Sequence, residues 1–134
     1  MKRCGFTVIE VMVVTVIVAI LTIIAMALYT PQELRGRRID GVNAILAIAL
    51  AEERYRSTNT QYGTLAQAYN SVTASPEGYY TLSVSGVTAS TYTITATAQG
   101  NQANDAQSGT SCATLQLAVS NGTSTKTPAV CWPS

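Results

Sequence analysis

Residues Phe6–Tyr29 read FTVIEVMVVTVIVAILTIIAMALY, and 20 of these 24 residues are apolar. The four exceptions are Thr7, Glu10, Thr15 and Thr22. A helix of about 20 apolar residues spans the hydrocarbon core of a bilayer. Lipid also favours a helix for this β-branched segment, because a helix satisfies its own backbone groups. The stretch therefore predicts a membrane-spanning helix over residues 6–30.

The five residues before this helix, MKRCG, form a short basic leader that ends in Gly5. Phe6 follows directly, and Glu10 stands five positions into the apolar run. A carboxylate within a membrane is costly, so Glu10 is a candidate functional residue. The alternative is an acid tolerated at the membrane edge. A cleaved secretory signal is disfavoured because the run is too long and lacks an A-x-A-like site, whereas a plain signal anchor stays open.

The basic leader, Gly5, Phe6, Glu10 and uninterrupted apolar helix resemble the class III signal of type IV pilins and of type II secretion pseudopilins. The resemblance implies that a membrane peptidase cuts between Gly5 and Phe6 and methylates Phe6. It also implies a cytoplasmic N-terminus before assembly. The charge bias alone does not decide orientation, because basic residues flank both ends of the span. Glu10 is expected to pair with the N-terminal amine of Phe6 in a neighbouring subunit.

A second helical stretch is expected after Pro31, ending near Arg56. Its predicted buried stripe follows the three- and four-residue spacing of a helix and contains Ile39, Val42, Leu46, Ala49 and Leu50. Its predicted outer face contains Arg38, Glu52, Glu53, Arg54 and Arg56. Pilins commonly carry Gly and Pro inside the apolar run, where this chain has Ala19 and Ala27. The nearest helix breakers are Pro31, Gly36 and Gly41, so we expect the helix to loosen between Tyr29 and Gly41.

The last part of the chain is polar, and three of its segments predict β-strands. From Ser57 to Ser134, 43 of 78 residues are Ser, Thr, Asn, Gln or Gly. Apolar and polar residues alternate around 80–84, 92–98 and 114–119, which is the period of a strand with one buried face. Asn121-Gly122 is a turn signal, and residues 100–111 are expected to form a loop. The predicted fold is α+β, with three or four antiparallel strands packed on the long helix.

The three cysteines predict one disulfide. Cys4 lies in the leader and is lost on cleavage, which leaves Cys112 and Cys131 in an exported domain where disulfides form readily. Two free buried thiols are the alternative. The pair resembles the disulfide that bounds the C-terminal loop of type IV pilins. Together with Tyr92–Gly100 and the terminal Cys131-Trp132, it is similar to the PilE-type minor pilins of Gram-negative bacteria.

The resemblance implies a leader at residues 1–5, a transmembrane and filament-core helix at 6–30, and a periplasmic or extracellular head at 31–134. It predicts a structural subunit of a type IV pilus, most like a minor pilin. The chain would cross the inner membrane once and then enter an extracellular filament. The implied partners are other pilins, the prepilin peptidase/N-methyltransferase and the inner-membrane assembly machinery.

Three other functions are weighed against this prediction. A type II secretion pseudopilin typically has a calcium loop, but beyond the helix only Glu77 and Asp105 are acidic. A tip adhesin or DNA-uptake pilin is the second alternative. After Arg56 the only cation is Lys126, so direct nucleic-acid binding is not expected. An enzyme is disfavoured because the chain has no histidine to activate a nucleophile. No metal or cofactor is expected.

Overall fold

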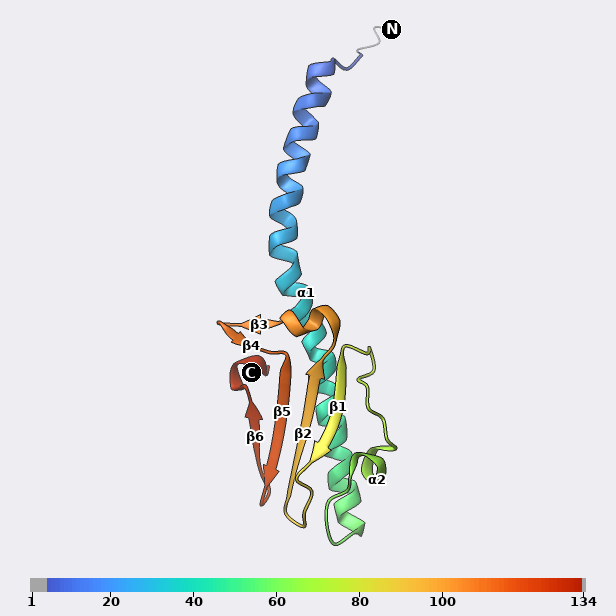
Figure 1. The fold of residues 1–134 in the computed structure, drawn as a ribbon. Helices are drawn as coiled ribbons and strands as arrows, with labels where there is room; N and C mark the ends of the chain where they lie inside the picture. Colours follow the sequence, from blue (N-terminus) through green and yellow to red (C-terminus); the bar gives the residue numbers. More distant parts are fainter. Residues whose placement is uncertain (1–4, 134) are drawn as a thin grey trace. The chain divides into compact units, whose positions relative to one another are not determined.

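The fold is taken from a computed structural model that describes residues 5–133. Cys4 and most of the basic leader therefore lie outside the described residues. The chain divides into two compact units, one ending at Glu33 and the other beginning at Leu34. The elements are α1 (Val8–Thr58), α2 (Leu65–Tyr69), β1 (Tyr80–Ser85), β2 (Thr91–Ala98), η1 (Gly100–Asn104), β3 (Ala106–Gln107), β4 (Thr110–Ser111), β5 (Thr114–Ser120), β6 (Thr123–Thr127) and η2 (Ala129–Cys131) (Figure 1).

The first part of α1 is apolar and exposed. Thr7 caps its start, since the Thr7 hydroxyl oxygen accepts the backbone N–H of Glu10 at 3.3 Å. The hydroxyls of Thr15 and Thr22 donate to the carbonyls of Met12 and Val18 at 2.8 and 2.7 Å. These threonines therefore bring no unsatisfied hydroxyl into an apolar environment. The helix is long and apolar enough to cross a membrane, as the sequence predicts.

The two helical stretches expected on either side of Pro31 are one helix. Pro31 lies inside α1, which continues to Thr58, close to the predicted end. At its C-terminal end, the side chains of Ser57, Thr58 and Asn59 donate to the carbonyls of Arg54 and Tyr55 at 2.7 to 3.2 Å. These bonds satisfy carbonyls in the last turn, which have no partner within the helix.

The head is an antiparallel sheet packed on a helix, which confirms the predicted α+β fold. The four strands lie in the order β1-β2-β5-β6 (Figure 1). Ile94 in the middle of β2 stands opposite Val84 of β1 and Leu117 of β5. The inner face of the sheet joins Ile45 and Ile48 of α1 in one buried cluster. The predicted strands account for β1, β2 and β5, whereas β6 is recognised only in the structure.

Gly41 allows the helix and the sheet to approach closely. A Cβ atom at Gly41 would lie 2.9 Å from the Tyr80 ring. Any other residue here would have to displace a fully buried aromatic side chain. Gly41 is therefore a packing position in α1, and the helix continues through it.

The predicted buried stripe of the head portion of α1 is partly wrong. Ile39, Leu46 and Leu50 are 45%, 47% and 53% exposed, whereas Val42 is buried. Two residues expected on the outer face are buried instead: Arg38 is 5% exposed and Glu52 is 0% exposed. Helical spacing identifies residues that share a face, but this helix has apolar residues on two faces. The sheet selects the face that contains Arg38 and Glu52.

Candidate functional site

The apolar span carries one charged residue, Glu10. Its side chain is exposed and forms no ion pair or side-chain hydrogen bond within residues 5–133. Phe6, Val11, Val14 and Thr15 line a shallow groove of about 250 Å³ beside it. Phe6 is 82% exposed. The first helical turns therefore present a carboxylate next to an apolar surface that nothing covers in the described chain.

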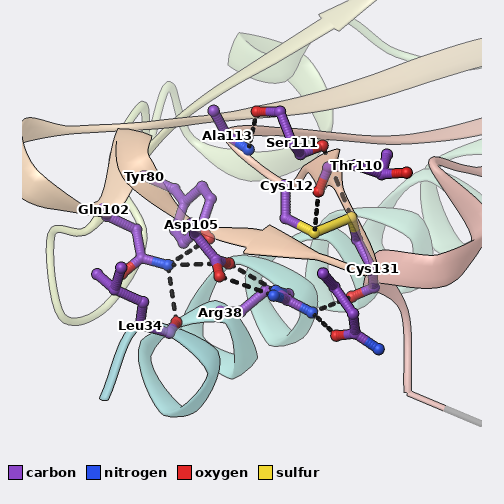
Figure 2. The surroundings of a disulfide bond; sticks show 11 residues. Leu34, Arg38, Tyr80, Gln102, Asp105, Thr110, Ser111, Cys112, Ala113 and Cys131 are labelled. Atoms are coloured by element: carbon purple, nitrogen blue, oxygen red, sulfur yellow. Dashed lines mark hydrogen bonds and ion pairs between the residues drawn. A yellow bond between two sulfur atoms is a disulfide. The ribbon is translucent and has the colours of Figure 1, made fainter. Parts of the chain in front are cut away.

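The head contains the predicted disulfide between Cys112 and Cys131. The sulfur atoms are 2.00 Å apart and the Cα atoms 5.6 Å apart (Figure 2). The two cysteines are 19 positions apart and enclose β5 and β6. The segment that the two cysteines close is thus mainly the β5–β6 hairpin, and β5 was predicted from the sequence. Both cysteines and Trp132 are buried in the same cluster.

A buried ion pair next to the disulfide joins three segments that are distant in sequence. Arg38 of α1 donates two hydrogen bonds to Asp105, from Nε at 2.6 Å and from Nη2 at 2.7 Å (Figure 2). Its Nη1 donates to Gln107 and, at 3.3 Å, to the carbonyl of Cys131. Arg38 therefore ties the helix to the Gly100–Ser111 segment and to the C-terminal end of the disulfide.

Gln102 extends this polar network to the sheet. Its side-chain nitrogen donates to the carbonyl of Leu34 at 2.9 Å, to the Tyr80 hydroxyl at 3.0 Å and to Asp105 at 3.3 Å (Figure 2). Burial raises the pKa of Tyr80, while the hydrogen bond from Gln102 acts in the opposite direction. The segment expected to be a plain polar loop is in fact anchored by two buried polar side chains.

A second polar cluster lies at the far end of the head helix. The Tyr62 and Tyr92 hydroxyls both donate to Glu53, at 3.1 and 3.3 Å. Their rings meet edge to face, with centroids 4.5 Å apart. Burial is the main cause that raises the pKa of both tyrosines; the hydrogen bond to Glu53 and its charge add to the rise. The cluster fixes the loop after α1 against β2.

Glu52 anchors the same loop from inside the core. One carboxylate oxygen accepts the backbone N–H of Gly63 at 2.8 Å, and the other has no partner within the described residues. Burial raises the pKa of Glu52, the Gly63 hydrogen bond opposes this, and the neighbouring Glu53 charge adds to it. Sequence spacing could have placed Arg38 and Glu52 on one face, but their charge argued for exposure.

The molecule thus has two distinctive regions. One is an exposed apolar helix with a single acidic residue, Glu10, in its first turn, and the other is an α+β head that contains a disulfide. These are the parts of a type IV pilin, a structural subunit that is anchored in a membrane and assembles with other pilin subunits into an extracellular pilus. Residues 1–26 match the prokaryotic N-terminal methylation motif. Residues 27–116 match the family described as type IV minor pilin ComP, DNA uptake sequence receptor.

The second match covers more than half of the chain, which therefore belongs to the ComP minor pilin family. This assignment confirms the predicted pilin resemblance and the prediction of a minor pilin subunit. A search of curated proteins finds no match to the chain.

Proposed function

We propose that the chain is cut between Gly5 and Phe6, is methylated at Phe6, and enters the pilus through its apolar helix. The match of residues 1–26 to the methylation motif supports this proposal. The partners that this processing and assembly need are a prepilin peptidase/N-methyltransferase and the inner-membrane assembly machinery. Before assembly the N-terminus lies in the cytoplasm and the helix crosses the inner membrane once. Purified filaments should then yield a first peptide that begins with methyl-Phe6, and recovery of Met1 or Cys4 would refute the cut.

Glu10 serves assembly in this proposal by pairing with the N-terminal amine of a neighbouring subunit's Phe6. The observation that carries it is a carboxylate without a partner among residues 5–133, beside an exposed apolar groove. In an apolar filament core an unpaired carboxylate is much more costly than a paired one. The pair therefore rewards one axial register. Phe6 and Glu10 of the same chain are also four residues apart on one helix face, so pairing within one subunit competes.

Competition between variants tests the role of Glu10. Cells express wild type together with Glu10→Val, which removes charge and hydrogen bonding, or with Glu10→Gln, which removes only the charge. Both variants should be processed and inserted normally but be depleted in sheared filaments. Thr15→Val is the matched control, because it changes a neighbouring residue of the same groove without removing a charge. Incorporation of Glu10→Val equal to that of wild type would identify Glu10 as a tolerated residue of the membrane edge.

The head portion of α1 offers a further contact for other subunits. Ile39, Leu46 and Leu50 are spaced seven and four residues apart along one side of the helix and are about half exposed. They lie on the side of the helix that does not face the sheet. Covering them in a filament removes apolar area from water and stabilises the assembly. Ile39→Ser and Leu46→Ser should therefore lower incorporation without unfolding the head.

DNA reception is the second candidate function, because the matched family is described as a DNA uptake sequence receptor. The chain offers few cations for this role: residues 34–133 contain five Arg and one Lys. Arg38 is neutralised by Asp105, and Arg56 is hydrogen-bonded to the carbonyls of Asn59 and Ala89. Fluorescence anisotropy with duplex DNA at two salt concentrations tests direct binding. A steep salt dependence that is lost in Arg35→Gln or Arg54→Gln would establish the chain as a DNA receptor.

A further inference from the structure

We infer that the outer face of the head sheet binds a neutral polysaccharide with an extended backbone. The four strands present 14 outward positions, and 12 of them are Ser or Thr. On β2 these positions are Thr91, Thr93, Thr95 and Thr97, and the two exceptions on the whole face are Gln116 and Ala118. None of the 14 side chains is buried, charged or aromatic.

The register makes this face an ordered array. Thr97 stands opposite Thr81 of β1 and Thr114 of β5, so hydroxyls continue across neighbouring strands. Rows repeat about every 4.8 Å across the strands and about every 6.8 Å along them. Threonine is β-branched and stiff at χ1, so its hydroxyl loses little conformational freedom on binding. The array is therefore preorganised for a ligand that offers many hydroxyl partners in an extended line.

Many of these hydroxyls have no partner among the residues that the structure describes. Thr93, Thr97 and Thr114 make no side-chain hydrogen bond to another described residue. Thr95 is different, because its hydroxyl oxygen accepts the Gln116 side-chain amide at 3.3 Å. A free hydroxyl both donates and accepts, which matches the hydroxyls of a sugar. Exposed sheet faces usually carry charged residues of both signs, which keep a protein soluble. This face carries no charged residue.

The absence of charge selects the class of ligand. An anionic polymer such as DNA gains affinity by replacing its counterions with Lys and Arg, and this face has none. A neutral glycan needs no counter-charge and can bond along the rows. Strands in a sheet twist by about 20–25° relative to one another, so a flexible, amorphous chain fits better than a flat crystal face. This inference goes beyond the assembly role and does not depend on it.

Retention on amorphous cellulose tests the inference. The full-length oxidised chain, in a zwitterionic detergent without sugar headgroups, is passed over the polysaccharide at 0.1 and 1 M NaCl. We expect retention that is the same at both salt concentrations. The double variant Thr93→Val/Thr97→Val keeps the branched shape and removes two free hydroxyls. It should weaken retention about fivefold for each hydroxyl, as expected for loss of a neutral hydrogen bond.

The control is Thr60→Val/Thr110→Val, which removes two exposed hydroxyls that lie outside the sheet face. It should be retained like wild type, and all variants should give the same circular dichroism spectrum. Heparin and duplex DNA columns form the anionic arm. Wild-type retention on cellulose no greater than that of an unrelated protein would overturn the inference. So would retention that falls steeply with salt, or DNA binding that is lost in the Thr93→Val/Thr97→Val variant.

Discussion

Loss of the Arg38 guanidinium should destabilise the head more than any exposed change on α1. In Arg38→Met the long side chain is kept, but both hydrogen bonds to Asp105 are lost. Asp105 is 1% exposed and retains only the Gln102 contact at 3.3 Å. Breaking one partner of a buried ion pair costs about 3–5 kcal/mol, because the other charge stays buried without compensation.

Urea unfolding of the oxidised full-length chain in detergent micelles measures this cost. Trp132, the one tryptophan of the chain, follows Cys131, whose carbonyl accepts Arg38, so its fluorescence reports this region. Arg35→Met is the matched control: Arg35 is exposed and lies one helical turn away, so its loss should change stability by no more than about 0.5 kcal/mol.

A double variant separates the buried charge from lost packing. Arg38→Met combined with Asp105→Leu removes both charges and should recover most of the stability lost in the single variant. The coupling free energy in this double-mutant cycle should reach at least about 1 kcal/mol. A loss of unfolding free energy in Arg38→Met no larger than that in Arg35→Met would refute the role of the buried ion pair. So would losses in Arg38→Met and Asp105→Leu that simply add in the double variant.

Three further predictions follow from the head and the helix. Cys112→Ser should lower the free energy of unfolding by about 3 kcal/mol, since the disulfide closes a loop of about 20 residues; intact mass before and after reduction must differ by two hydrogens, and two alkylatable thiols in the native chain would contradict the bridge. Burial raises the pKa of Glu52 above its ordinary value of 4.5. The stability that the protonated Glu52 contributes is therefore fully present below pH 4.5 and is lost as the pH rises through the folded-state pKa. Glu52→Gln should therefore flatten the stability profile above pH 4.5, and an unchanged profile in urea titrations would argue against it. In an assembled filament α1 should loosen between Tyr29 and Gly41, because Pro31 lacks an amide donor; a filament map with an unwound segment at residues 19–27 and continuous helix through Gly36 would contradict this.

The features of the N-terminal part of this protein can be predicted from the sequence alone because they depend only on residues close together in the chain. A leader ending in Gly5, an apolar run and Glu10 at a set distance are read without knowing any tertiary contact. Alternation along 80–84, 92–98 and 114–119 predicts β1, β2 and β5, because the pleat places neighbouring side chains on opposite faces. The disulfide was also predictable, since loss of the leader leaves two cysteines in an exported domain.

The tertiary structure decides which face of the head helix is buried. Ile39, Leu46 and Leu50 are as apolar as Ile45 and Ile48, and only the sheet determines which of them it covers. Arg38 and Glu52 are charged, and charge ordinarily predicts exposure. Burial of Arg38 depends on Asp105, a residue 67 positions away in sequence, and Glu52 is held by Gly63, beyond the end of α1. Asp105 and Gly63 lie outside α1, so the spacing of residues within the helix does not reveal these contacts. The buried polar contacts form only when the chain folds.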